Sequence, residues 1–505
     1  MSTATSSLAF RALLKSAAAA SGLARKPARL SGVSPAAAAL HAAVVAQDQP
    51  AVIVVPTDAE IESMVADAGF FLSVLLGWSP TDAARHVLPF PSPEVDPYRG
   101  LAPHFQVASA RARALFALAT GTARLVVTSA RALLPRLADP VRFAAGGLVV
   151  APGTEIPPHD LGDRLAAAGF VREDPVDEHG EFCVRGGVVD VFPSSESHPI
   201  RLEFIGDVVE SVRQYDAATQ RSLAAVDQLA IVPQREEMLG ESGAPDRSSG
   251  LVDYVRRAGA SLIVLELDDV DAHGRALETQ WRTSERDMAA RGRDVPPFDA
   301  IAWPWDALAA WLSSGRHVSE LAVEGVAAGA APADHVACQP AMAFHGRFGD
   351  WVAELCQAND RGDRTLFIAA TAGRADRAID LLGEYDLRAR RLEGDEGPVH
   401  ATVFVTTGEL SRGFALPAAQ LRFYAETDVF EEERHPHERQ RSVVRTFLSD
   451  FRDLKVGDFV VHVDSGIGRF VGLKRLAISS LESGRSGAGE AREHEFMELR
   501  YAGDD

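Results

Sequence analysis

The chain has 505 residues, which predicts three to four domains at roughly 150 residues each. A hydrophobic fraction of 46% and a charged fraction of 24% are typical of globular proteins, and no apolar run reaches the roughly 18 residues that a membrane span needs. The formal net charge of −20 argues against the whole chain being a sequence-independent DNA binder, because phosphate contacts need a basic face. We therefore expect protein partners and no membrane partner.

The first part of the chain, residues 1–40, is expected to be a leader. The first 47 residues contain no Asp or Glu and carry five basic residues, a composition that resembles an organellar transit peptide. The alternative is a helical leader that opens the first domain. We favour this alternative because nothing else in the chain has an organellar composition.

Residues 41–138 show the pattern of an α/β layer. The apolar run Ala51–Val55 precedes an amphipathic segment whose N-cap candidates are Thr57 and Asp58, and Leu125–Val127 repeats the pattern with Ser129 as the cap. Strands that are apolar on both faces and are followed by helices predict a parallel sheet with helical cover.

The remainder of the chain alternates in character. Short strands with turns predict a β-rich domain at 139–225, and helical and strand signals return at 226–325. An Ala/Gly/Pro-rich linker is expected at 326–339, a small α/β domain with Thr371 as a helix cap at 340–430, and a charged linker at 431–452. A final β-rich piece occupies 453–505.

The sequence contains no recognisable catalytic or cofactor-binding motif. A P-loop needs a lysine after its second glycine, yet no Gly-Lys pair occurs, and the chain has no lysine between Lys26 and Lys455. Asp268 and Asp269 follow a strand as in a Walker B segment, but without a phosphate cradle they are better read as a turn and helix cap. We therefore expect this chain alone not to be an enzyme.

No metal site or disulfide is predicted either. The three cysteines are scattered and odd in number, which favours a reducing, cytoplasmic location. His435 and His437 flank a proline in a charged run without further ligands in register, so they are interpreted as solvated linker residues.

Two arginines in the β-rich domain raise a more specific hypothesis. If residues 193–199 close a hairpin with Phe192 opposite Ile200, then Arg185 and Arg201 share one face, roughly 20 Å apart at about 3.3 Å per residue. In this register Val189, Val191, Glu203, Ile205 and Asp207 lie on the same face. The core side then carries Val184, Val188, Phe192, Ile200, Leu202 and Phe204, and is apolar apart from Asp190. A slip by one residue would invert each assignment. Such a strip is compatible with a protein interface or with a solvated sheet face.

Two segments resemble known families. Glu178–Ser222 closely resembles the UvrB-like module shared by excision-repair subunit UvrB and transcription-repair coupling factors. Leu454–Leu476 resembles the start of the RNA-polymerase-interacting domain of coupling factors, which CarD-type regulators also contain. Both segments in this order indicate a transcription-repair coupling factor. UvrB itself and a CarD-type regulator with an N-terminal extension remain the alternatives.

The resemblance implies a function in transcription-coupled nucleotide-excision repair. The chain would be an adaptor that recruits UvrA through Arg185, Arg201 and Ile205, where relatives carry an aromatic in place of Ile205. It would bind the β subunit of stalled RNA polymerase, and the residues implied are Leu476, Arg469, Phe470 and Lys474. Leu476 has an alternative role in the core of the last strand.

The resemblance also implies a fold, and it implies which part of the longer factor binds nucleotide and DNA. The expected fold class is α/β and α+β, multidomain: a degenerate RecA-like lobe with an inserted β-rich UvrB-like domain, a second small α/β domain, and a partial Tudor/CarD-like β-barrel. The sequence stops at Asp505, partway through this barrel, and is expected to be part of a longer factor. ATP, Mg²⁺ and DNA are expected to bind only the ATP-driven translocase motor of that factor.

Overall fold

The first sheet is built from short apolar strands buried on both faces. The computed structural model describes residues 8–100, 102–193, 196, 198–234, 236, 244–321, 334–392, 403–430, 459–462, 466–478 and 492–500. Its first sheet has seven strands, in the order β15-β1-β14-β13-β2-β4-β3, and each neighbouring pair is parallel. The strands are β1 Arg29–Ser31, β2 Ala51–Val55, β3 Val87–Phe90, β4 Leu125–Ser129, β13 Ser261–Leu265, β14 Arg316–Ser319 and β15 Asp334–His335.

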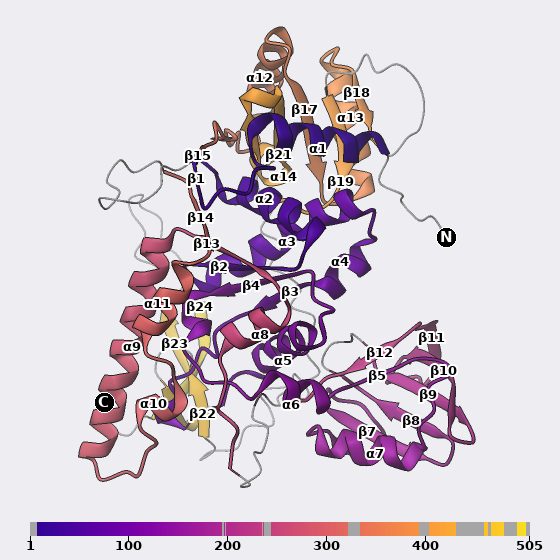
Figure 1. Ribbon diagram of the computed structural model, residues 1–505, viewed down its shortest axis with the longest axis vertical. Coiled ribbons are helices and arrows are strands. Elements are labelled where there is room, and N and C mark those ends of the chain that lie inside the picture. Colours follow the sequence, from indigo (N-terminus) through magenta and orange to yellow (C-terminus); the bar gives the residue numbers. More distant parts are fainter. Residues whose placement is uncertain are drawn as a thin grey trace. The chain divides into compact units, whose positions relative to one another are not determined.

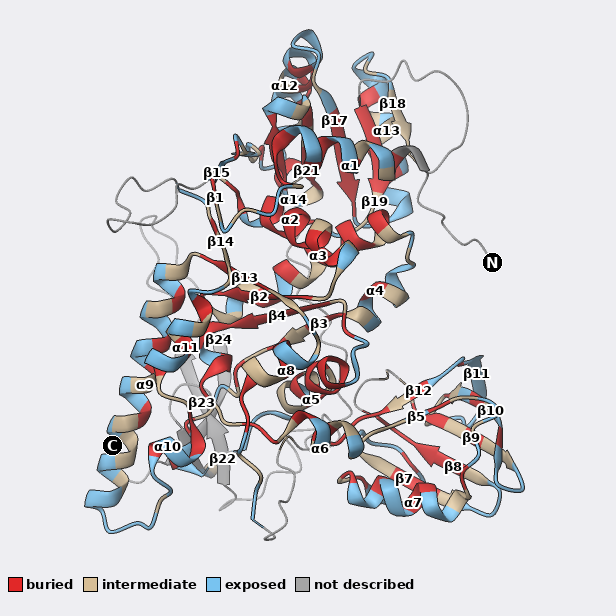
Figure 2. Cartoon of the chain, in the orientation of Figure 1, coloured by how far each residue is buried: buried red, intermediate tan, exposed pale blue. Residues whose placement is uncertain are grey.

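Helices cover both faces of this sheet, as the apolar strands predict (Figure 1). The helices of this part of the chain are α2 Pro35–Asp48, α3 Ile61–Leu76, α4 Pro80–His86, α5 Phe105–Thr120, α6 Pro140–Ala145, α8 Leu251–Arg257, α9 Leu267–Ala290, α10 Phe298–Ile301 and α11 Trp305–Leu312. Helix α1, Leu8–Ser21, packs against α2, α3 and the turn Pro417–Ala419 of the second sheet. Strand β2 divides its side chains between two cores, with Ile53 facing the cluster of α1–α3 and Val54 facing that of α5, α8 and α9. Figure 2 shows the central strands β2, β4 and β13 as almost wholly buried.

The predicted leader is part of this layer. Strand β1 pairs with β14, and α1 and α2 contribute buried residues to the core, including Phe10, Leu14 and Leu40. The expected boundary at residue 40 falls inside α2. The absence of acidic residues has a structural reason here, since ten of the fourteen residues of α2 are buried and a carboxylate among them would be desolvated.

A second α/β sheet follows, with the strand order β16-β20-β21-β17-β19-β18. Its strands are β16 Gln339–Pro340, β17 Arg364–Ala369, β18 Ala389–Arg391, β19 Val403–Thr407, β20 Phe414–Leu416 and β21 Leu421–Ala425, and its helices are α12 Phe348–Asp360, α13 Ala372–Glu384 and α14 Glu426–Val429. Thr371 caps α13 as predicted, because its side chain accepts a hydrogen bond from the backbone N–H of Arg374. The expected linker 326–339 is shorter than predicted, since residues 334–335 and 339 belong to strands β15 and β16.

The two α/β sheets share one hydrophobic core. The ring of Phe71 on α3 packs edge-on against Phe414 and Phe423 of the second sheet, with centroid distances of 6.2 and 6.1 Å. Beside these rings, the buried carboxylate of Asp67 accepts hydrogen bonds of 2.6 Å from both the backbone N–H and the hydroxyl of Ser411. The second sheet is therefore joined to the first by packing and by a buried polar contact.

The β-rich domain is inserted between α6 and α8. It contains a six-stranded sheet, ordered β11-β10-β9-β8-β7-β6, and the two-stranded ribbon β5–β12. The elements are β5 Leu148–Val150, α7 Pro158–Ala167, β6 Val171–Arg172, β7 Glu181–Arg185, β8 Val188–Val191, β9 Ile200–Ile205, β10 Val208–Tyr215, β11 Ser222–Ala225 and β12 Leu229–Ile231. Because β12 pairs with β5, the domain extends beyond the expected end at 225. The domain also begins later than the expected residue 139, because Phe143 of α6 belongs to the core of the first sheet.

The C-terminal part forms a separate unit, residues 433–505, and is described by itself. It contains the antiparallel strands β22 Phe459–His462, β23 Gly466–Ile478 and β24 Arg492–Arg500. The charged segment 431–452 lies outside the described residues. Within the described residues no single helix is long and apolar enough to cross a membrane; the segments Asp58–Leu76 and Pro80–His86, bent by 117° at their break, meet the criteria of length and composition as a pair.

Asp67 is expected to make stability depend on pH in an unusual direction. Burial, the largest cause, and the nearby acids Glu409 and Asp428 raise the pKa of Asp67 from 3.8 to about 6, against the lowering effect of the hydrogen bonds from Ser411. The folded chain therefore holds a proton that the unfolded chain releases, so this contribution to the free energy of unfolding is lost as pH rises from 3.8 to about 6.

Asp67→Asn removes the titrating group and keeps one acceptor oxygen for Ser411. We expect the difference in unfolding free energy between wild type and Asp67→Asn to change across this pH window and to stay constant above it. Denaturant unfolding of the full chain at several pH values measures this difference, and the exposed acid Asp268, changed to Asn, is the control. The same pH dependence in wild type and Asp67→Asn would contradict the assignment.

Candidate functional site

The two predicted arginines lie on one face of the six-stranded sheet. Residues 184–192, which form a single strand in the assumed hairpin, belong to two strands, β7 and β8. These strands meet at Gly186 and Gly187, with Arg185 paired to Val188. Gly186 has φ of 59°, the left-handed conformation that a tight hairpin turn requires. The Gly-Gly pair between two apolar runs is a sequence signal from which this hairpin could have been predicted.

The register of the next hairpin differs from the assumed one by one residue. Val191, not Phe192, lies opposite Ile200, and Val189 lies opposite Leu202. Val189 and Val191 are therefore wholly buried on the core side, which corrects their predicted place beside the arginines. The core face packs against α7 and the β5–β12 ribbon through Phe182, Val189, Val191, Ile200, Leu202, Val209 and Val212.

The opposite face carries the charged residues. Across four strands, Cys183, Asp190, Arg201 and Arg213 lie in one row, because each is the register partner of the next. Arg185 and Glu203 lie in the adjacent row with Val188 between them, so the prediction that placed Val188 on the core side is wrong. Ile205, at the end of β9, is 64% exposed. We call Arg185, Arg201, Arg213 and Ile205 the arginine face.

Asp190 holds two of these arginines in place. Arg201 donates from Nε to Oδ1 of Asp190 at 2.7 Å and from Nη2 to Oδ2 at 2.9 Å, and Arg185 donates from Nη2 to the same Oδ2 at 2.9 Å. The expected separation of roughly 20 Å is therefore wrong, because β7 and β9 both flank β8. Sequence reasoning placed Asp190 on the core side and so missed this carboxylate.

Further contacts orient each guanidinium differently. Arg201 stacks over the ring of Tyr215 at 4.5 Å, and its Nη2 also donates to Gln220 at 3.0 Å. The hydrogen bond to Asp190 raises the pKa of Arg201 above its ordinary value, so this guanidinium stays charged. Arg185 has a second acid, Asp174, whose Oδ1 lies 3.4 Å from its Nη1.

The exposure of the three side chains separates their roles. The side chain of Asp190 is 1% exposed, that of Arg201 is 22% exposed and that of Arg185 is 47% exposed. A buried carboxylate without a partner costs several kcal/mol, so Arg201 compensates a charge that the fold has already desolvated. Arg185 reaches solvent while anchored at one end, which suits a side chain that contacts another molecule.

The predicted polymerase-binding residues lie on β23. Arg469 is exposed and pairs with Phe459 and Arg500. Lys474 and Leu476 are two residues apart and lie opposite Phe496 and His494, so they share a face of the strand. Their side chains, and that of Phe470, lie outside the described part of the structure.

The other sequence candidates do not converge on a site. Asp268 and Asp269 lie in the first turn of α9, but the predicted cap is wrong, because the N-cap residue is Glu266 and no side chain caps this helix. His435 and His437 lie outside the described residues. Among the residues that are described, no group of three His, Cys, Asp or Glu side chains could hold a metal ion.

Arg201 and Arg185 are expected to differ in their effect on stability. Arg201→Ala leaves Asp190 with one partial partner and should lower the free energy of unfolding of the β-rich domain by about 3 kcal/mol. Arg185→Ala removes a half-exposed pair and should cost about 1 kcal/mol or less. Denaturant unfolding followed by circular dichroism measures both.

A second substitution provides the control for this difference. Adding Asp190→Asn to Arg201→Ala removes the uncompensated charge and should recover part of the loss. Equal destabilisation by the two single variants, or no recovery in the double variant, would contradict the role given to Asp190.

Two family models match the chain. The UvrB interaction domain matches residues 148–236, which include the arginine face, and the CarD-like/TRCF RID domain matches residues 454–505. The boundaries of the first match agree with the β5–β12 ribbon, which opens and closes the inserted domain.

Curated relatives extend the similarity over almost the whole chain. The transcription-repair-coupling factor of Myxococcus xanthus is 28% identical over 93% of this chain and 43% of its own length. Those of Mycobacterium tuberculosis and Bacillus subtilis are 28% and 22% identical, over 94% and 77% of this chain and 42% and 37% of their own. The chain thus spans less than half the length of these relatives. With both domains present in this order, the chain is similar to transcription-repair-coupling factors over most of its own length.

Proposed function

We propose that this chain is an adaptor in transcription-coupled nucleotide-excision repair, with one surface that recruits UvrA and another that binds stalled RNA polymerase. The observation that carries the proposal is the arginine face, which lies inside the segment matched by the UvrB interaction domain. The experiment that tests it is the binding of UvrA to variants of that face.

The geometry of the arginine face supports a protein partner. Arg185 and Arg201 are held by a common carboxylate, so little side-chain entropy is lost when a partner binds them. Ile205 adds an exposed apolar contact at the edge of the same face, and Arg213 adds a third exposed cation. Arginine beside exposed apolar area is typical of interaction hot spots.

The polymerase-binding surface is proposed on β23, within the segment matched by the CarD-like/TRCF RID domain. Leu476 and Lys474 share one face of this strand by their register. We propose Leu476 as the apolar contact to the polymerase β subunit, with Arg469, Phe470 and Lys474 as neighbours.

Recognition, not nucleotide hydrolysis, is the activity proposed for this chain. At the carboxyl end of β2, where α/β folds commonly bind phosphates, the carboxylate of Asp58 accepts hydrogen bonds from the backbone N–H of Ser92 at 2.8 Å and from the hydroxyls of Ser92 and Ser129 at 2.6 and 2.9 Å. A carboxylate there repels a phosphate and uses donors that a phosphate would need. ATP and Mg²⁺, and contact with DNA, are proposed for a translocase motor that acts with this region in the longer factor.

Arg185→Ala combined with Ile205→Ala is expected to weaken UvrA binding by about thirtyfold or more, since hot-spot side chains contribute about 2 kcal/mol. Both side chains are substantially exposed, so the fold should be retained. Calorimetry with purified UvrA measures the affinity. Arg164→Ala is the matched control, because Arg164 is exposed on α7, which covers the opposite face of the sheet. Undiminished binding by the double variant would overturn the UvrA assignment.

Leu476→Arg is expected to weaken binding to RNA polymerase at least about tenfold, because a charge replaces the proposed apolar contact. UvrA binding should be unchanged, since Leu476 lies in the separate C-terminal unit. Pull-down of polymerase and of UvrA by the same protein preparation compares the two. If polymerase binding is retained, or if both are lost together, Leu476 is not the contact proposed.

A further inference from the structure

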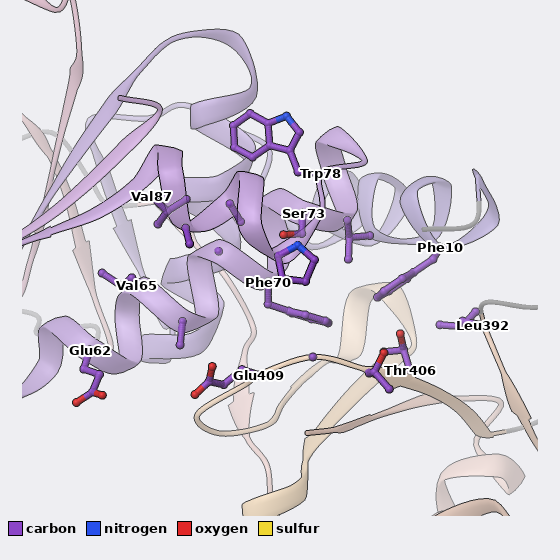
Figure 3. A pocket seen from close by; sticks show the side chains of 18 residues that line it. Phe10, Glu62, Val65, Phe70, Ser73, Trp78, Val87, Leu392, Thr406 and Glu409 are labelled. Carbon is purple, nitrogen blue, oxygen red and sulfur yellow. The ribbon is translucent and has the colours of Figure 1, made fainter. Parts of the chain in front are cut away.

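A large apolar pocket lies where the two α/β sheets meet, and the residues that line it do not include those of the arginine face. It has a volume of about 450 Å³ and is lined by α1, α3 and α4 on one side and by β19 and its following loop on the other. Figure 3 shows Phe70 at its centre, with Phe10 and Leu392 toward one end. Pockets of roughly 300–1,000 Å³ with mostly apolar walls are the usual size for a bound ligand group.

The empty space over Gly69 is a specific feature of this pocket. Gly69 lies in the middle of α3, where glycine is less favourable than alanine. A Cβ atom placed on Gly69 would meet no other atom within 4 Å, although neighbouring Ala68 and Phe70 are buried. The helix therefore carries a weak helix former at a position where a side chain would fit, and the space it leaves belongs to the pocket.

The charges at the rim are all of one sign. Glu62 of α3 and Glu409 of the loop after β19 line the pocket and are exposed, and in Figure 3 their carboxylates lie at the end away from Phe10 and Leu392. The described residues that line the pocket include no Lys, Arg or His. Arg11, next to Phe10, is not among them, and its Nε donates to the carbonyl oxygen of Val74 at 3.2 Å. In the described part of the chain, neither glutamate forms an ion pair.

We propose that this pocket binds a peptide segment of a partner protein that inserts one aromatic side chain and carries Lys or Arg beside it. The apolar walls would take the aromatic side chain, and Trp78 and Phe70 offer it ring contacts. Glu62 and Glu409 lie at the rim, so they would contact a positive charge that lies outside the pocket. In the peptide, that charge belongs to residues that flank the inserted aromatic residue. This complementarity favours a basic, aromatic peptide over a neutral ligand.

The test titrates the full chain with four probes by calorimetry at about 0.15 M salt, which screens non-specific attraction to the acidic chain. The probes are Ac-Arg-Trp-Arg-NH₂, Ac-Glu-Trp-Glu-NH₂, Ac-Arg-Ala-Arg-NH₂ and N-acetyltryptophanamide. Ac-Arg-Trp-Arg-NH₂ should bind at least about tenfold more tightly than each of the other three. In the double variant Glu62→Gln with Glu409→Gln, the affinity for Ac-Arg-Trp-Arg-NH₂ should exceed that for Ac-Glu-Trp-Glu-NH₂ by less than about threefold.

Gly69→Leu fills the pocket without replacing any wall residue. It should weaken binding of Ac-Arg-Trp-Arg-NH₂ about tenfold or more without lowering the melting temperature. Gly349→Leu is the matched control, because Gly349 lies in α12, also has open space over it and does not line the pocket. The proposal is overturned if no probe binds saturably up to about 1 mM, if Gly69→Leu binds normally, or if Ac-Arg-Ala-Arg-NH₂ or N-acetyltryptophanamide binds as tightly as the basic tryptophan peptide.

Discussion

The arginine face depends on one buried carboxylate. Asp190 lies on β8, the strand shared by the β7–β8 and β8–β9 hairpins, and its carboxylate is almost wholly desolvated. Such a charge is stable there only because arginines from both neighbouring strands bond to it. The same bonds fix the direction of Arg185 and Arg201. The proposed recognition would therefore be coupled to folding at this site, since one of the two arginines proposed to meet a partner also compensates a charge in the fold.

The two α/β sheets are a single body for a related reason. Their shared core is apolar around Phe71, but it contains the carboxylate of Asp67, which is satisfied by Ser411 of the second sheet. Apolar packing is tolerant of small shifts, whereas a buried carboxylate requires its donors at one position. The polar contact thus specifies how the loop after β19 sits on α3, and this arrangement also forms the pocket between them.

Two physical features of this chain are consistent with the proposed role in recognition. The first sheet keeps the strand–helix layout in which nucleotides bind. At the carboxyl ends of its strands, however, the carboxylate of Asp58 accepts hydrogen bonds from the hydroxyls of Ser92 and Ser129 and from the backbone N–H of Ser92. The inserted β-rich domain instead presents charge on a rigid sheet face, where side chains are well positioned for a macromolecular partner.

The sequence by itself determined the local elements: apolar runs such as Ala51–Val55 form buried strands, Thr371 and Ser129 cap the helical turns that follow them, and no P-loop lysine occurs. These features depend on neighbours along the chain. Only the tertiary structure decided the hairpin register that places Val191 opposite Ile200, the convergence of Arg185 and Arg201 on Asp190, and the joining of the two sheets at Phe71. In a strand of period two, a slip by one residue exchanges the faces, so local pattern cannot identify which alternate residues meet across strands.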